Sequence, residues 1–254
     1  MRRRELLFMT LTGGVAARGA GRVDVIAHRG EHLECPENTM PAIEKAIALG
    51  VDWVEIDVRT TKDAHFVLMH DGSVERMTNG KGEVAGMTLA EIRALDAGAR
   101  KPGFAGTRVP TLEEALGAMR GRCGVYLDAK RIGAEQIVAA LRGQGMLDRC
   151  VVYGGMALMK ELTELGYPGL AMPEAVSVDV SRRILAELQP RVIAFDRRDF
   201  TPEIVAMAAG AKKGIFVDRL GADDTPEKWR AAVAMGATGI QTDHPAELIE
   251  MLRA

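Results

Sequence analysis

Short apolar runs rich in β-branched residues alternate along the chain with longer segments whose apolar residues recur at helical spacing. The runs are continuously apolar and do not alternate with polar positions, which is typical of strands buried on both faces of a parallel sheet. The pattern predicts eight strands, near residues 23–27, 53–58, 125–129, 151–154, 169–173, 192–196, 215–218 and 239–243.

Residues that start and stop helices occur between these runs. Asn38 and Thr39 precede an apolar-periodic segment that ends at Gly50. Further helix starts are indicated by Thr201-Pro202 and Thr225-Pro226, and by the capping-box spacing of Thr88 with Glu91 and of Thr111 with Glu114. Eight strand-helix units predict an α/β fold, a (β/α)8 TIM barrel. An open doubly wound sheet fits less well, because no Gly-x-Gly-x-x-Gly follows the first strand.

The second strand differs from the others, because 72 residues separate its start at Trp53 from that of the third strand at Val125. The apolar runs 54–60 and 66–71 are too close together for a helical crossover, so we expect them to form a hairpin. Residues 72–108, which are rich in glycine and polar residues, predict a small insertion with one short helix near 89–95. Residues 22–254 are otherwise expected to form a single domain.

Residues 1–21 resemble an export signal. Three arginines precede an apolar stretch at 6–17 and small residues at 19–21, and the paired arginines are similar to a twin-arginine signal. Arg18 interrupts the small residues, so an N-terminal helix packed on the domain is the alternative. We therefore expect an exported, periplasmic protein, with a cytoplasmic location as the alternative. The stretch is too short to span a bilayer and no other segment resembles a span, so no stable membrane insertion is expected.

Charge and cysteine content narrow the choice of partners. The 33 basic and 35 acidic side chains nearly balance and no long Lys/Arg run occurs, which argues against nucleic-acid binding. Three cysteines are too few for a disulfide scaffold, so stability has to come from a buried core. A small-molecule substrate is the expected partner, and the oligomeric state is left open.

Polar residues at the C-terminal ends of the predicted strands are the candidates for chemistry, because barrel active sites lie there. Glu55 and Asp57 are two positions apart on one strand and so face the same side, and Asp128 ends the third strand. Three carboxylates predict a divalent cation, and all-oxygen ligands favour Ca²⁺ or Mg²⁺ over zinc. A purely structural ion cluster with Arg29 and Lys130 is the alternative interpretation.

Two histidines complete the set. His28 follows the first strand and His70 ends the hairpin. Histidine titrates near neutrality, so one ring could accept a proton while the other donates one. Arg29 and Lys130 would supply positive charge to an anionic substrate group. A carboxylate-held metal, two histidines and two cations are what cleavage of a phosphodiester requires.

These residues lie in motifs that resemble the glycerophosphodiester phosphodiesterase family, within the superfamily of phospholipase C-like phosphodiesterases. The matching motifs are HRG (28–30), PENT (36–39), VEIDV (54–58), MHD (69–71), VPTLEEAL (109–116) and GIQTDHP (239–245). The resemblance implies a (β/α)8 barrel that hydrolyses glycerophosphodiesters to glycerol 3-phosphate and an alcohol with Ca²⁺ or Mg²⁺.

The resemblance also assigns roles to individual residues. It implies that His28 and His70 are the acid/base pair, that Glu55 and Asp57 bind the metal and that Arg29 contacts phosphate. A mechanism proposed for the family has the glycerol 2-hydroxyl attack phosphorus to give a cyclic phosphate, which water then opens. Which histidine acts first is left open.

The chain departs from the family pattern at three places. The family's Glu-x-Lys at the third strand is Asp-Ala-Lys at 128–130, and sphingomyelinase D enzymes also resemble this chain in using Asp there. Segments 153–155 and 216–219 differ as well, which changes the alcohol side of the predicted pocket. Lysophospholipase D-like or sphingomyelinase D-like lipid cleavage is therefore the alternative function, and a non-catalytic phosphate-binding barrel is a second alternative.

Several polar residues near these motifs receive no catalytic role. Glu37 and Asn38 are expected to order the loop after the first strand by capping and turn hydrogen bonds, with His32 at the pocket rim. The charged pairs 196–197 and 218–219 end later strands, where rim salt bridges and selection of the alcohol group are equally good interpretations.

Overall fold

The computed structural model describes residues 21–254. The predicted export signal or N-terminal helix over 1–21 lies, except for Gly21, outside the described residues. The strands are β1 (Asp24–Ala27), β2 (Trp53–Thr60), β3 (Phe66–Leu68), β4 (Gly124–Arg131), β5 (Cys150–Tyr153), β6 (Val192–Phe195), β7 (Gly214–Asp218) and β8 (Gly239–Thr242). Within 21–254, no helix has the length and apolar character needed to cross a bilayer.

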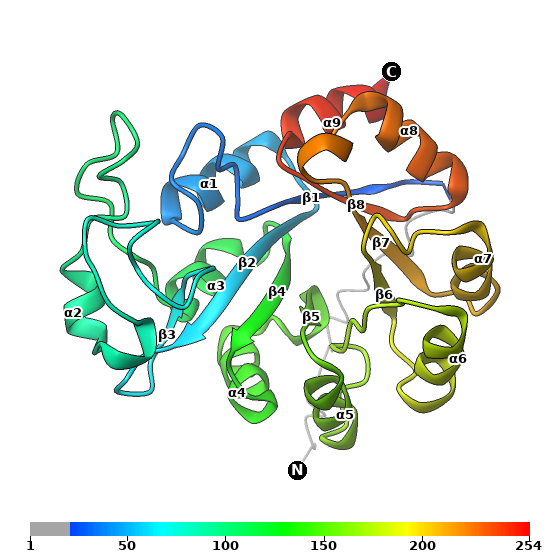
Figure 1. Ribbon diagram of the computed structural model, residues 1–254, viewed down its shortest axis with the longest axis horizontal. Coiled ribbons are helices and arrows are strands. Elements are labelled where there is room, and N and C mark those ends of the chain that lie inside the picture. Colours follow the sequence, from blue (N-terminus) through cyan, green and yellow to red (C-terminus); the bar gives the residue numbers. More distant parts are fainter. Residues whose placement is uncertain (1–20) are drawn as a thin grey trace, which may run out of the picture.

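Helices surround the strands (Figure 1). They are α1 (Met40–Leu49), α2 (Leu89–Arg93), α3 (Leu112–Met119), α4 (Ala134–Gln144), α5 (Met156–Glu164), α6 (Val178–Glu187), α7 (Pro202–Gly210), α8 (Pro226–Met235) and α9 (Pro245–Arg253). The predicted capping boxes of α2 and α3 are present, with Thr88 and Thr111 each accepting from the backbone three residues on. At α1, in contrast, the Thr39 hydroxyl donates to the Pro36 carbonyl and does not cap the helix.

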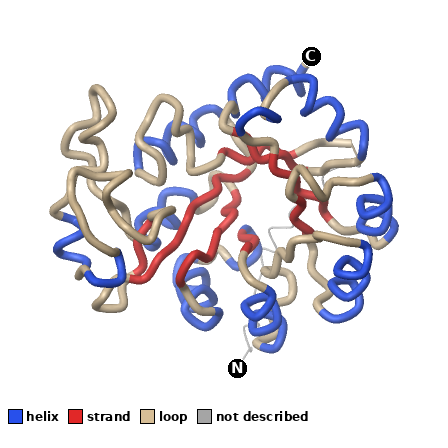
Figure 2. Tube along the Cα trace, in the orientation of Figure 1, coloured by secondary structure: helices blue, strands red, loops and turns tan. Residues whose placement is uncertain are grey.

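Parallel strands form a ring in the order β5-β4-β2-β1-β8-β7-β6, which confirms the predicted TIM barrel (Figure 2). The pairing of β1 with β8 joins the two ends of the described chain, with Ala27 opposite Thr242. Because all ring strands are parallel, their C-terminal ends meet at one mouth.

The predicted strand at 169–173 is the one barrel strand that does not form regularly. Figure 1 draws no arrow between β5 and β6, and only isolated bridges link Ala171 to Val152 and Glu174 to Ala194. Pro173 has no backbone N–H, which leaves too few donors for a continuous ladder. Its carbonyl still accepts from Ala194, so residues 170–175 close the ring with a few hydrogen bonds on each side.

Apolar side chains fill the barrel and separate it from the helices. The barrel interior holds Ile26, Trp53, Tyr126, Val151, Met172, Val192, Ala194 and Phe216. A larger cluster between the strands and the helices is the main core, and burial of this kind is the chief stabilising contribution in a chain without disulfides. Gly124 provides room for Trp53, because a Cβ there would lie 2.3 Å from the Trp53 ring.

The predicted hairpin and insertion extend from β2. β3 pairs antiparallel with β2, with Thr60 opposite Phe66. Residues 72–108 follow, carry the short helix α2 and pack around a small apolar cluster of their own that includes Val74, Val84 and Ile92. They lie to one side of the barrel, where β2 and β3 reach furthest from the ring (Figure 1).

Candidate active site

Glu55, Asp57 and Asp128 converge at the mouth of the barrel. Glu55 and Asp57 alternate with outward apolar residues on β2, and Asp57 pairs in register with Asp128 on β4. One carboxylate oxygen of each lies within 4.8 Å of the others. Glu55 and Asp57 are only 2% and 1% exposed, so the acidic charge is concentrated below the surface. The three residues are placed as a set that could hold a metal ion.

The electrostatics of this group fit a divalent cation. Burial, together with the neighbouring Asp57 and Asp128 carboxylates, raises the pKa of Glu55 well above its ordinary value. Burial also raises the pKa of Asp128, although Lys130 opposes the effect. Buried carboxylates that oppose one another's ionisation need positive charge. Lys130 supplies part of it, because its Nζ lies 2.7 Å from Asp128 Oδ2 and 3.3 Å from Asp57 Oδ1.

The turn after β1 supports the acidic group from the other side. Arg29 has a φ of 54°, and in this conformation its backbone N–H donates to Glu55 Oε2 at 2.7 Å. Its Nε lies 3.3 Å from Asp57 Oδ2. Gly30 follows with a φ of 77°, and a Cβ there would lie 2.7 Å from the Ala42 carbonyl carbon, so only glycine fits this turn.

Asn38 acts differently from the expected capping role. Its side-chain amide donates to Asp57 Oδ2 at 2.7 Å and accepts from the Asp57 backbone N–H at 3.0 Å. Asn38 is fully buried, and so it fixes the rotamer of a candidate metal ligand. Glu37 also contacts the site, accepting from Arg29 at 3.1 Å.

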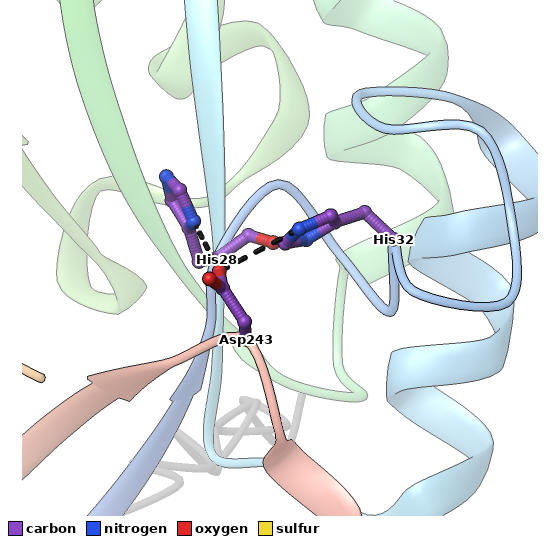
Figure 3. A group of neighbouring side chains, drawn as sticks. All are labelled: His28, His32 and Asp243. Atoms are coloured by element: carbon purple, nitrogen blue, oxygen red, sulfur yellow. Dashed lines mark hydrogen bonds and ion pairs between the residues drawn. The ribbon is translucent and has the colours of Figure 1, made fainter. Parts of the chain in front are cut away.

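His28 leaves β1 at the mouth and is held by an acid from β8. Its Nδ1 lies 2.6 Å from Asp243 Oδ1 (Figure 3). Burial lowers the pKa of His28, and the hydrogen bond to Asp243 partly opposes this. The same bond helps to hold the pKa of Asp243 below its ordinary value against the effect of burial. The bond at Nδ1 leaves Nε2 of His28 as the nitrogen available to a substrate.

His70 has a similar arrangement at the end of the hairpin. Its Nδ1 lies 2.7 Å from Asp71 Oδ1, and its carbonyl accepts two hydrogen bonds from Arg59. Arg76 bonds Asp71 and holds the pKa of that carboxyl down at about 2. Arg76 also donates twice to Glu37, which links the hairpin to the turn after β1.

The structure thus brings the predicted site residues to one mouth and connects them. They are His28, Arg29, Glu55, Asp57, His70, Asp128 and Lys130.

Comparison of the sequence with known proteins identifies the family of this chain. A profile of the glycerophosphoryl diester phosphodiesterase family matches residues 28–131. A glycerophosphodiester phosphodiesterase of Caldanaerobacter subterraneus is 31% identical over 247 residues, which cover 90% of this chain and 97% of that protein.

The chain belongs to the glycerophosphodiester phosphodiesterase family. The predicted family, and with it the enzyme class, is confirmed. The matches to two Bacillus subtilis relatives span only 51% and 55% of the length of those proteins.

Solved structures of glycerophosphodiester phosphodiesterases share the fold. The enzyme of Agrobacterium tumefaciens strain C58 is 27% identical and has a TM-score of 0.80, covering 90% of this chain and 99% of that one. A phosphodiesterase of Oleispira antarctica, solved with the product sn-glycerol 3-phosphate, also has a TM-score of 0.80 at 22% identity, covering 91% of this chain and 97% of that one.

Sequence reasoning assigned no role to Asp243, the residue of this family member's site that contacts His28. It lies in the GIQTDHP motif and ends a predicted strand, so the strand-end rule that identified His28 and His70 would also have identified it. A buried carboxylate holds it in place. Asp224 accepts from the Asp243 backbone N–H at 2.6 Å and also from the Thr242 hydroxyl and the Trp229 indole.

The half of the mouth formed by β5, residues 170–175, β6 and β7 carries further acidic side chains, which have fewer basic partners. Tyr153 donates to Glu174 at 2.8 Å, and Asp196 is bonded by Arg198. Among the described residues, none donates a side-chain or backbone hydrogen bond to the Asp218 carboxylate, and burial together with Asp196 and Glu174 raises its pKa to about 7. Rim salt bridges therefore account for Asp196 but not for Asp218.

We expect Asp218→Asn to stabilise the protein in a pH-dependent way. The pKa of Asp218 is higher in the folded than in the unfolded protein. The wild-type protein therefore becomes less stable as pH rises from about 4 to about 7, and this loss is complete above pH 7. The asparagine variant should therefore match the wild type near pH 4 and exceed its Tm by roughly 5 °C at pH 8. Thermal unfolding followed by circular dichroism measures this, and an equal Tm at both pH values would contradict it.

Proposed function

We propose that this protein hydrolyses glycerophosphodiesters to glycerol 3-phosphate and an alcohol, with His28 and His70 as the acid/base pair. The observation that carries the proposal is the pairing of each histidine through Nδ1 with its own carboxylate, Asp243 or Asp71, beside the buried acidic group. A structural ion cluster would not need two oriented imidazoles.

Each ring can exchange a proton with the substrate at Nε2, because Nδ1 is occupied. One ring removes the proton of the attacking hydroxyl, the other protonates the departing alcohol oxygen, and the roles reverse when water opens a cyclic phosphate. Arg29 and Lys130, which both lie beside Asp57, would bind the phosphate oxygens. Their positive charges would stabilise the negative charge that builds up on the phosphoryl oxygens.

Glu55, Asp57 and Asp128 would hold the divalent cation, and the all-oxygen donor set suits Ca²⁺ or Mg²⁺. When bound, the cation neutralises phosphate charge and offsets the mutual repulsion of the three carboxylates. Asn38 and the Arg29 backbone N–H keep Asp57 and Glu55 oriented for it.

The direct test is release of glycerol 3-phosphate from glycerophosphocholine with Ca²⁺, with Mg²⁺ or with EDTA. Cation-dependent release that is lost in His28→Ala would support the reaction and the site together. Absence of release by folded, cation-loaded wild type across choline, ethanolamine and inositol esters would rule out this function and leave lysophospholipid cleavage or a non-catalytic phosphate-binding barrel.

Asp243→Asn is expected to lower kcat about 10²-fold by letting the His28 ring move from its position. The change also removes a negative charge that favours the imidazolium, so the pKa of His28 should fall further. In the pH dependence of kcat/KM, the limb that reflects protonation of His28 should shift to lower pH. Asp179→Asn, on the exposed surface of α6, is the matched control. An unchanged rate and profile in Asp243→Asn would show that the bond does not position His28.

A second candidate function is cleavage of lysophospholipids, and the apolar residues at the mouth favour it. Leu33, Met156 and Val176 are exposed and follow β1, β5 and the 170–175 segment on the side of the active site. Met156 and Val176 also line a groove of about 370 Å³ between α5 and α6, together with Pro173 and Ile184. Such a groove next to the catalytic mouth suits a single alkyl chain.

Val176→Asp should separate the two functions. We expect it to lower kcat/KM for lysophosphatidylcholine about tenfold, the effect of losing roughly 1.5 kcal/mol of apolar contact, and to leave glycerophosphocholine hydrolysis unchanged. Choline release from each substrate is the measurement. Leu165→Asp, exposed at the opposite end of α5, is the control. Equal effects on both substrates would eliminate the groove as an alkyl-chain site.

A further inference from the structure

A second group of metal-binding side chains lies beside the acidic cluster. It consists of His28, His32 and Asp243, whose ligand atoms lie within 4.8 Å of one another. Figure 3 shows both imidazoles directed toward the Asp243 carboxylate, His28 and His32 from the turn after β1 and Asp243 from the end of β8. The side chains are 14%, 17% and 22% exposed, so the group is recessed but open to small solutes.

His32 carries a feature typical of metal-binding histidines. Its Nδ1 lies 2.8 Å from the His28 carbonyl oxygen, and a proton on Nδ1 makes this a hydrogen bond. Such a bond to a backbone carbonyl fixes the ring and leaves an unprotonated nitrogen for a metal. That nitrogen, Nε2, lies 3.6 Å from Asp243 Oδ1. Lys101 fixes the loop further by donating to the carbonyls of His32 and Leu33.

The distances are close to those of a zinc site. Ligand atoms on a tetrahedral zinc with bonds of about 2.0–2.1 Å lie roughly 3.3 Å apart. The His32 to Asp243 distance of 3.6 Å is near this value, and the His28 to Asp243 distance of 2.6 Å needs to open by less than 1 Å. Three protein ligands leave a fourth position for water or an anion.

The donor types separate this group from the acidic cluster. Two imidazoles and one carboxylate favour zinc, whereas Glu55, Asp57 and Asp128 offer only oxygen and favour Ca²⁺ or Mg²⁺. We propose that His28, His32 and Asp243 form a second metal site, which takes Zn²⁺ on Nδ1 of His28. The remaining proton then stays on Nε2, so the ring can no longer accept a proton there and the enzyme is inhibited. The inhibitory effect rests on the proposed function, but Zn²⁺ binding does not.

Zn²⁺ binding is tested first, without reference to activity. Mg²⁺ at saturating concentration fills the acidic cluster, and Zn²⁺ is then titrated by calorimetry against wild type, His32→Gln and His65→Gln. His65 lies at the hairpin tip, 56% exposed, and serves as the matched control. We expect one Zn²⁺ per chain for wild type and His65→Gln, and at least tenfold weaker binding for His32→Gln. Equal binding by all three proteins would overturn the proposal.

Inhibition is tested with the same proteins. In the absence of Zn²⁺, His32→Gln should hydrolyse glycerophosphocholine like wild type, because His32 has no part in the proposed reaction. Zn²⁺ should lower wild-type activity at least tenfold, and His32→Gln should need at least ten times more Zn²⁺ for the same loss. Inhibition that is equal in both and relieved by excess Mg²⁺ would place Zn²⁺ on the acidic cluster and overturn the proposal. If no protein hydrolyses the substrate, the proposed function fails while the binding result stands.

Discussion

Replacing His28 by alanine is expected to lower kcat about 10³-fold, which is the middle of the range for loss of a general acid or base. The Asp243 carboxylate would then lose its hydrogen bond to His28, and His32 is not expected to replace Nε2 of His28, since its own Nε2 is directed at Asp243 at 3.6 Å. Steady-state glycerol 3-phosphate release measures the effect, with folding checked by thermal unfolding.

His65→Ala is the control for this experiment, because His65 lies at the exposed hairpin tip. It should retain wild-type activity. His70→Ala should lose activity to a similar extent as His28→Ala, and the double variant should lose little more, because the two rings act in one proton transfer sequence. Retention of a tenth or more of the activity by His28→Ala would exclude an acid/base role.

Removal of the divalent cation is expected to lower activity about 10³-fold, since charge stabilisation of several kcal/mol is lost and each 1.4 kcal/mol is a factor of ten. Added Ca²⁺ or Mg²⁺ should restore it, and Asp57→Asn should prevent full restoration. Full activity in metal-free protein would eliminate a metal role for Glu55, Asp57 and Asp128.

The same carboxylates predict how cation binding affects stability. Without a cation, the pKa values of Glu55 and Asp128 are raised, so the folded state holds protons that the unfolded state releases near pH 4. Stability of the metal-free protein therefore falls as pH rises above about 4. The increase in Tm on adding Ca²⁺ should be larger at pH 8 than at pH 5, and an equal increase would contradict the coupling.

Much of the fold could be predicted because it depends on local patterns. Continuous apolar runs identified β1, β2 and β4, and turn and capping residues located the helices between them. The segment 169–173 has the same apolar pattern, yet it forms only isolated bridges, because Pro173 lacks the backbone N–H that a regular strand needs. Whether this segment forms a strand depends on its hydrogen bonds to the neighbouring strands, and the spacing of apolar residues does not predict those bonds.

The site was predictable where residue type alone suggested a role. His28, His70, Glu55 and Asp57 end or line strands, and the C-terminal ends of barrel strands meet at one mouth, so these residues were expected to lie together. The contacts of Asn38 with Asp57, and of Asp243 with His28, join segments 19 and 215 residues apart in the sequence. Such contacts follow from tertiary packing, which strand-end rules do not specify.

The contact between Asp243 and His28 also bears on when activity can appear during synthesis. The ribosome makes His28, the acidic cluster and His70 early, while Asp243 follows His28 by 215 residues. A nascent chain that ends before β8 therefore carries the candidate metal ligands and both histidines, but His28 has neither its carboxylate nor the backbone bond from its N–H to Thr242. Under the proposed mechanism, full turnover would become available only when β8 closes the ring, and incomplete chains would hydrolyse phosphodiesters poorly.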